Sequence, residues 1–205
     1  MMKIFKSTLL TFLVLVSLLN SHQLIDIKKA NPTIIIDLRY ATTQNFTGKK
    51  IYTKNICYVQ QDIVPLLDSI QKELNQQGLG LKIWDAYRPK EAQQAFWDIV
   101  HDEHYVSHPT KGRRVHLRGV AIDVTLIDLK TGKELLMPTE FDNFSLKAHA
   151  NSLTGINQEA INNRKKLQHI MIKHGFKPVT TEWWHFDKIN WQKYPILDIK
   201  FEELD

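Results

Sequence analysis

Apolar residues recur every three or four positions in two long segments, as they do on the buried face of an amphipathic helix. These segments are residues 62–78 and 157–175. Gly78 and Gly175 stand where the two helices should end, because glycine readily adopts the left-handed backbone of a helix C-terminus. A further helix should begin at Pro89, because proline fits the first turn of a helix. The pattern therefore predicts three helices.

Shorter apolar segments predict strands. They are residues 33–40, 79–85, 120–128 and 176–186, with a hairpin turn at residues 130–133. Between about residues 101 and 115 the pattern is lost, and a surface loop is expected. Because helices and strands do not alternate regularly, the sequence predicts an α+β fold in which helices flank a mostly antiparallel central sheet.

The first 21 residues have the pattern of a secretory signal. Lys3 and Lys6 precede an uncharged segment, residues 8–19, which is too short to span a bilayer core of about 30 Å. An uncleaved N-terminal anchor is the alternative interpretation. We expect residues 1–21 to be removed, residues 22–205 to form one domain, and the protein to be periplasmic or secreted without stable membrane association.

Charge and cysteine content narrow the possible partners. Basic residues outnumber acidic ones by 27 to 22, and no run of five basic residues occurs, so nucleic acid is not an expected partner. The single cysteine, Cys57, cannot form an intramolecular disulfide. The domain must therefore be held by its core or by a metal. Nothing in the sequence indicates the oligomeric state.

Residues 116–123, HLRGVAID, place an acid inside an apolar strand. The carboxylate of Asp123 would be costly to bury unless it met a cation, a set of hydrogen-bond donors or a metal. His116 stands at the mouth of a turn that Gly119 permits, so the two side chains could bind one ion. Alternatively, Asp123 pairs with an arginine and His116 lies on the surface.

Residues 180–186, TTEWWHF, offer a third ligand in His185. Catalytic zinc sites typically have three protein ligands and one position for water, whose pKa the metal lowers to about 7. Glu182 could then act as the base that takes a proton from this water. Because residues 182 and 185 lie on opposite faces of a regular strand, the strand must end, twist or bulge at Trp183–Trp184.

Arg88 stands at a predicted strand-to-helix junction, fixed by Pro89. A guanidinium there could stabilise the oxyanion of a tetrahedral intermediate. The alternatives are a solvated arginine and one that pairs with Asp85.

These residues lie within longer motifs that resemble a known family. The motifs are DLRYATTQNFTGKKIY (37–52), LGLKIWDAYRPKEA (79–92), HLRGVAIDVTL (116–126), FDNF (141–144) and GFKPVTTEWWHF (175–186). They resemble the D-alanyl-D-alanine dipeptidases, the VanX-type zinc enzymes related to D,D-carboxypeptidases. The resemblance runs from about residue 34 to about residue 195. It implies a hedgehog/D,D-peptidase-like fold with a zinc site on the sheet and one Zn²⁺ per chain.

The resemblance also implies roles for the catalytic residues. It makes His116, Asp123 and His185 the zinc ligands. Glu182 becomes the catalytic base, and Arg88 becomes the side chain that assists the transition state.

The resemblance implies substrate contacts as well. Tyr40 and Asp142 match positions that help to hold the dipeptide, the aspartate through the free ammonium. One departure from the family concerns Arg114, because the family usually has serine two residues before the first zinc histidine. Arg114 could bind the terminal carboxylate of the dipeptide or reshape the pocket.

The sequence thus predicts an exported zinc dipeptidase that hydrolyses D-Ala-D-Ala, or a similar small D,D-dipeptide, by attack of zinc-bound water. One alternative is a D,D- or L,D-carboxypeptidase acting on peptidoglycan stem peptides. Asp142 argues against it, since such substrates have no free ammonium at that place. The other alternative is a zinc-holding binding module without turnover, which would need neither Glu182 nor Arg88.

Overall fold

The computed structural model describes residues 23–204 of the 205-residue chain. The predicted signal peptide, residues 1–21, lies outside the described residues. Within the described part, no helix is both long and apolar enough to cross a membrane.

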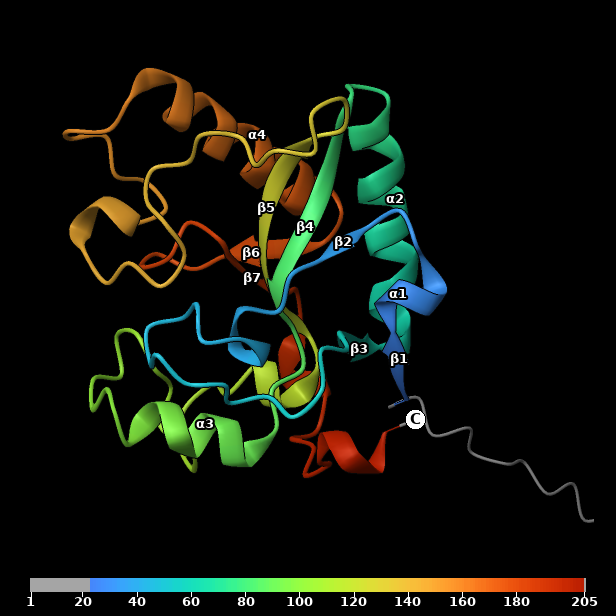
Figure 1. Cartoon of the computed structure of the whole chain (residues 1–205), viewed down its shortest axis with the longest axis vertical. Helices are drawn as coiled ribbons and strands as arrows, with labels where there is room; N and C mark the ends of the chain where they lie inside the picture. The colour runs from blue at the N-terminus through green and yellow to red at the C-terminus, as the bar shows by residue number, and fades with distance from the viewer. Residues whose placement is uncertain (1–22, 205) are drawn as a thin grey trace, which may run out of the picture.

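A five-stranded sheet in the order β2-β4-β5-β7-β6 forms the centre of the described region (Figure 1). Its strands are β2 (Ile35–Ile36), β4 (Leu79–Asp85), β5 (Ala121–Asp128), β7 (His185–Lys188) and β6 (Phe176–Pro178). Each neighbouring pair is antiparallel except β2 and β4. A second sheet pairs β1 (Leu24–Asp26) with β3 (Tyr58–Gln60). The predicted mostly antiparallel sheet is therefore confirmed.

Two long helices pack on this sheet, as the apolar periodicity predicts. These two are α2 (Val64–Asn75) and α4 (Gln158–Lys173). Two shorter helices are α1 (Ile27–Ala30) and α3 (Lys90–Trp97). Helix α2 contacts β4, and α4 contacts β5 and β6. Helix α3 follows Pro89 and lies away from them, towards one end of the molecule (Figure 1). Single 3-10 turns occur at Arg39–Ala41, Gln61–Ile63, His116–Arg118, Leu146–Ala148, Trp191–Lys193 and Phe201–Glu203.

Two predicted strands differ from the structure. The strand predicted for residues 33–40 contains only β2, because the chain turns into a 3-10 helix in which the carbonyl of Tyr40 accepts the N–H groups of Ile51 and Tyr52. The segment predicted as one closing strand, residues 176–186, forms two antiparallel strands joined by a loop. In that loop the backbone of Thr180 and Trp183 pairs with Ala150 and Ala148, and the carbonyl of Trp184 accepts an N–H group from β5, that of Val124.

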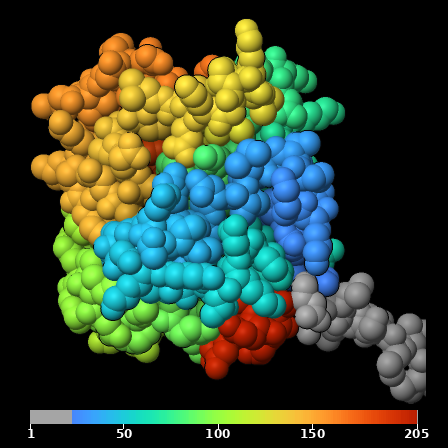
Figure 2. Space-filling view, in the orientation of Figure 1, coloured from blue at the N-terminus to red at the C-terminus, as the bar shows by residue number. Residues whose placement is uncertain are grey.

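Strand β5 is buried along all of its length except its last residue. In Figure 2 the segments coloured blue to cyan and yellow to orange cover most of the visible face, so that little of β4 and β5 can be seen. Any polar side chain on the covered part of β5 must therefore find partners inside the protein.

Candidate metal centre and active site

The register of the sheet brings three polar residues together. Asp123 on β5 lies directly opposite His185 on β7, so their side chains share one face of the sheet. A register shift between Ile83 and Asp85 on β4 also places Asp85 opposite Asp123. Asp85, Asp123 and His185 therefore lie side by side across three strands.

His116 reaches the same place from the 3-10 turn that precedes β5. Gly119 ends this turn with a φ of +68°, a left-handed conformation that lets the chain enter the strand. The Nδ1 atom of His116 lies 2.7 Å from the carbonyl oxygen of Ala86. Since a carbonyl can only accept, Nδ1 donates its hydrogen to Ala86, and Nε2 is directed at Asp123 and His185.

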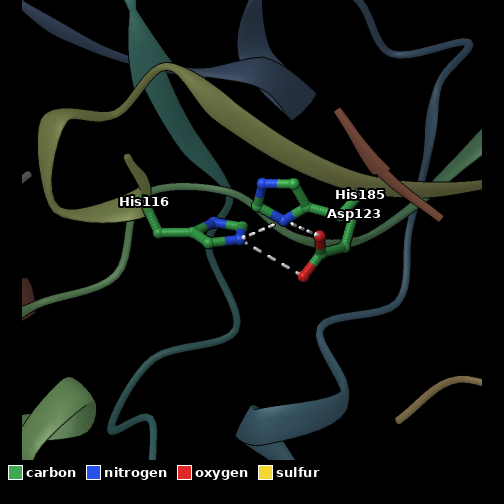
Figure 3. A group of neighbouring side chains, drawn as sticks. All are labelled: His116, Asp123 and His185. Carbon is green, nitrogen blue, oxygen red and sulfur yellow. Dashed lines mark hydrogen bonds and ion pairs between the residues drawn. The ribbon is translucent and has the colours of Figure 1, made fainter. Parts of the chain in front are cut away.

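The three side chains point towards one another (Figure 3). His116 Nε2 lies 3.1 Å from His185 Nδ1 and 3.4 Å from Asp123 Oδ2, and His185 Nδ1 lies 3.0 Å from Asp123 Oδ1. One ligand atom from each residue falls within 4.8 Å of the others. His185 Nε2 lies 2.8 Å from Asp187 Oδ1, which leaves Nδ1 free to bind a metal. Two oriented imidazoles and a carboxylate fit a catalytic zinc ion.

The charge states of these side chains also suit a metal. Burial lowers the pKa of His185 to about 4, so its imidazole is neutral near neutral pH. Burial alone would raise the pKa of Asp123, but His116 and His185 beside it bring that pKa well below its usual range. Asp123 is therefore ionised, and its carboxylate can bind a cation directly.

Glu182 faces the same centre from the loop before β7. Its Oε2 atom lies 3.8 Å from His185 Nδ1. Strand β7 begins at His185, so the irregularity predicted at Trp183–Trp184 is confirmed. Burial, with the negative charges of Asp123 and Asp142, raises the pKa of the Glu182 carboxyl well above its usual range. A divalent cation held beside it would lower that pKa again.

The two tryptophans have different roles in holding this loop. Trp183 is fully buried, and its indole N–H donates to Thr139 Oγ1 at 2.9 Å. Trp184 is also buried, but it lines the cavity beside His116, Asp123 and His185. Trp183 therefore anchors the loop in the core, while Trp184 forms a wall of the site.

Arg88 lies in the site and pairs with Asp85 as well. Its Nε and Nη2 atoms lie 3.0 and 2.7 Å from Asp85 Oδ2, and its Nη1 lies 3.0 Å from Gln93 Oε1. Its Nη2 is also 3.9 Å from Asp123 Oδ2. The pairing predicted as the alternative is thus present, and it holds the guanidinium rigidly at the cavity wall.

Tyr40 and Asp142, which are distant in sequence, meet at the cavity. The Tyr40 hydroxyl donates to Asp142 Oδ1 at 2.9 Å. The other oxygen, Oδ2, is buried and has no hydrogen-bond partner among the described residues. Burial raises the pKa of Asp142 to about 7. A buried carboxylate oxygen without a donor indicates that a ligand supplies one.

One cavity of about 240 Å³ is lined by Tyr40, Arg88, His116, Asp123, Asp142, Glu182 and His185. Its aromatic walls are Phe46, Phe96, Tyr105, Phe144 and Trp184. Arg114 does not line this cavity, whereas its neighbour Arg113 does. Sequence reasoning missed Asp187 and Arg113. Asp187 could have been found, because residues two apart in a strand share a face and Asp187 follows His185 by two positions. No sequence pattern distinguishes Arg113 from Arg114 as a residue of the cavity.

Gly119 permits a direct test of how the His116 turn is held. A Cβ atom there would lie 2.8 Å from Leu24 Cδ2, in addition to the strain of a positive φ. Gly119→Ala should therefore lower the free energy of unfolding by about 1–3 kcal/mol or more, measured by urea denaturation. Gly132→Ala, at a φ of +70° with open space around it, isolates the backbone strain. A Gly119→Ala protein as stable as the Gly132→Ala protein would contradict the expected clash.

Comparison with known proteins gives a consistent result. A family model described as D-ala-D-ala dipeptidase (Peptidase_M15) matches residues 20–202. The D-alanyl-D-alanine dipeptidase of Escherichia coli K12 is 37% identical over 182 residues, which cover 89% of this chain and 93% of that protein. The D-alanyl-D-alanine dipeptidase of Enterococcus faecium is 33% identical over 73% of this chain and 83% of that protein. A solved Zn(II) complex of a mutant of the vancomycin resistance D,D-pentapeptidase VanY is 17% identical, with 69% of this chain and 78% of that one covered and a TM-score of 0.43.

Proposed function

Since the chain belongs to the family of D-ala-D-ala dipeptidases, we propose that it hydrolyses D-Ala-D-Ala, or a similar D,D-dipeptide, with one zinc ion per chain. One observation carries this proposal. His116, Asp123 and His185 converge on one point, and Glu182 faces them with its Oε2 atom 3.8 Å from His185 Nδ1. The expected product is two molecules of D-alanine per D-Ala-D-Ala, measured by a D-amino-acid assay. Failure to release D-alanine from the zinc-loaded protein would contradict the proposal.

The chain's own side chains account for the proton transfers. When bound, zinc supplies a Lewis acid that polarises the amide carbonyl and acidifies a water molecule. Glu182 takes a proton from the attacking water as its oxygen bonds to the carbonyl carbon. Arg88 donates a hydrogen bond to the oxygen on which negative charge develops. Glu182 then gives its proton to the leaving nitrogen as the carbon–nitrogen bond breaks.

Asp142 and Tyr40 provide the selectivity for a free dipeptide. Asp142 Oδ2 has no protein donor within the described residues, so the ammonium of a dipeptide would satisfy it. The Tyr40 hydroxyl holds the other oxygen in place. A substrate with an acylated amine would leave this buried carboxylate without a cation. Such a site rejects the wrong substrate strongly.

Asp142→Asn should therefore weaken selection for the free amine. Asparagine tolerates the φ of +58° at this position and keeps an acceptor for Tyr40. The loss of one charge-assisted hydrogen bond should lower kcat/KM for D-Ala-D-Ala by about 10- to 100-fold, chiefly through KM. Steady-state kinetics against D-Ala-D-Ala and N-acetyl-D-Ala-D-Ala would measure both substrates. If the ratio of kcat/KM for D-Ala-D-Ala to kcat/KM for N-acetyl-D-Ala-D-Ala is the same in the variant and in the unaltered enzyme, Asp142 does not bind the ammonium.

The same substitution makes a prediction about stability. The folded-state pKa of Asp142, about 7, is above the usual aspartate value, so this carboxyl favours folding at low pH and loses that contribution as pH rises through 7. Asp142→Asn should consequently be more stable than the unaltered protein at pH 8 and similar to it at pH 4. Thermal denaturation at the two pH values checks this difference, and equal midpoints at pH 8 would contradict it.

Two other functions are less well supported. A carboxypeptidase acting on stem peptides has no ammonium to place against Asp142, and the family relatives carry the dipeptidase name. A binding module without turnover would require neither Glu182 nor Arg88. We further propose that residues 1–21 direct export to the periplasm or outside the cell, where the enzyme would act on wall fragments. N-terminal sequencing of the mature protein tests this, since an intact Met1 would contradict cleavage.

A further inference from the structure

Arg113 occupies a position in the site that neither the motifs nor the family resemblance assigns. It precedes the His116 turn and lines the main cavity. It also lines an adjoining cavity of about 50 Å³ that is shared with His116 and His185. Its side chain is 51% exposed, so its guanidinium is open to a ligand.

The side chain of Arg113 is fixed on one side only. Its Nη2 forms an ion pair with Asp187, the carboxylate that orients His185, and its guanidinium lies 5.6 Å from the centre of the Trp191 ring. Within the described part of the chain, Asp187 is its only ion-pair partner. Arg88, by contrast, directs three of its nitrogens at Asp85 and Gln93. Of the two arginines in the main cavity, Arg113 therefore has the larger unused donor capacity.

The order of charges along the two cavities matches a zwitterionic dipeptide. The unpaired carboxylate oxygen of Asp142 marks the ammonium end. The adjoining cavity beside Arg113 contains His116 and His185 but neither Tyr40 nor Asp142. Asp142 thus lines only the main cavity, whereas His116, His185 and Arg113, whose guanidinium has donors that Asp187 leaves unused, line both cavities. A dipeptide presents its groups in the same order: ammonium, scissile amide, carboxylate.

We propose that Arg113 binds the C-terminal carboxylate of the dipeptide with the donors that Asp187 leaves free. This inference rests on the proposed function and assigns to Arg113 the contact that the sequence suggested for Arg114. Arg114 lines the smaller cavity but not the main one. The guanidinium geometry suits a carboxylate, because two N–H groups can bind its two oxygens in parallel.

The test compares D-Ala-D-Ala with D-alanyl-D-alaninamide, which lacks the carboxylate charge. The variant Arg113→Gln keeps an N–H donor for Asp187 but removes the positive charge. We expect kcat/KM to fall about 10- to 100-fold for the acid and less than about 3-fold for the amide, which corresponds to one hydrogen bond to a charged group. Zinc content, measured by atomic absorption, should stay the same. Lys111→Gln, which removes an exposed positive charge from the same loop, should behave as the unaltered enzyme.

Each other outcome overturns the inference in a distinct way. An equal loss on both substrates with zinc retained would mean that Arg113 acts only through Asp187 and His185. Loss of the acid preference in Arg114→Gln, and not in Arg113→Gln, would assign the carboxylate to Arg114.

If Arg113→Gln does not bind zinc, the variant Arg113→Lys, which keeps the positive charge, tests the proposal instead. Recovery of zinc together with the acid preference supports the proposal, whereas recovery of zinc without that preference overturns it. Absence of hydrolysis of either substrate by the unaltered zinc-loaded enzyme overturns the proposed function itself, and this inference with it.

Discussion

Glu182→Gln should leave zinc bound and almost abolish hydrolysis. The glutamine keeps the size of the side chain but cannot accept the proton of the attacking water or return one to the leaving amine. General acid–base catalysis contributes about 10²- to 10⁴-fold, so kcat for D-Ala-D-Ala should fall by at least that range. Because Glu182 is not one of the three converging ligands, the zinc content should remain near that of the unaltered protein. Turnover assays and atomic absorption on the same preparation measure both quantities.

The matched control for this variant is Glu103→Gln. Glu103 also lines the cavity, but it is exposed, lies in the loop after α3 and is not one of the three converging ligands. It should change kcat by less than about 3-fold, as surface substitutions usually have small effects. Near-normal turnover of Glu182→Gln would remove Glu182 from the mechanism. A loss of zinc in that variant would instead make Glu182 part of the metal site.

Asp123→Ala should lose both zinc and activity. Asp123 supplies the only carboxylate among the three converging ligands, and its oxygens lie 3.4 Å from His116 Nε2 and 3.0 Å from His185 Nδ1. Its removal leaves two imidazoles, fewer than the three protein ligands of a catalytic zinc site. Activity should fall below detection, and the purified protein should contain far less than one zinc per chain. Asp123→Ala protein that still holds a full zinc equivalent would refute the proposed ligand set.

A graded pair of variants tests the same site more finely. Asp187→Asn removes the carboxylate that orients His185 but leaves the three ligands, so zinc affinity should fall by about 10- to 100-fold without being lost. Asp128→Asn, at the far end of the same strand as Asp123, should bind zinc normally. Competition with a chromophoric chelator ranks the three. Zinc affinity should be highest in Asp128→Asn, lower in Asp187→Asn and lowest in Asp123→Ala. Any other order would contradict the assignment of Asp123 as a ligand and of Asp187 as the residue that orients His185.

The sequence predicted those elements that local periodicity determines. The helices at residues 62–78 and 157–175 agree with α2 and α4 within a few residues, because each buries one continuous apolar stripe. The single strand predicted for residues 176–186 is wrong, because its apolar residues belong to two strands and to a partly buried loop between them. This loop pairs with Ala148 and Ala150, and no local pattern reveals so distant a partner.

In the candidate site, too, some residues could be predicted from local sequence and others depend on distant pairing. Asp123 could be singled out in advance because a carboxylate in an apolar strand needs a partner, the family resemblance implied His116 and His185 as its companions, and the structure brings these three together. Asp85 gave no such signal. Its place opposite Asp123 depends on a register shift in β4, which is decided by pairing across the sheet. The choice between Arg113 and Arg114 likewise depends on the path of an irregular loop.

The most direct test of a zinc dipeptidase compares D-Ala-D-Ala with N-acetyl-D-Ala-D-Ala on the zinc-loaded protein, with and without a chelator. D-Alanine should be released rapidly from the free dipeptide and at least about 100-fold more slowly from the acylated one, because Asp142 is then left without a cation. The chelator should abolish the activity, and added zinc should restore it. Equal hydrolysis of the two substrates, or hydrolysis that persists after zinc has been removed, would contradict this account.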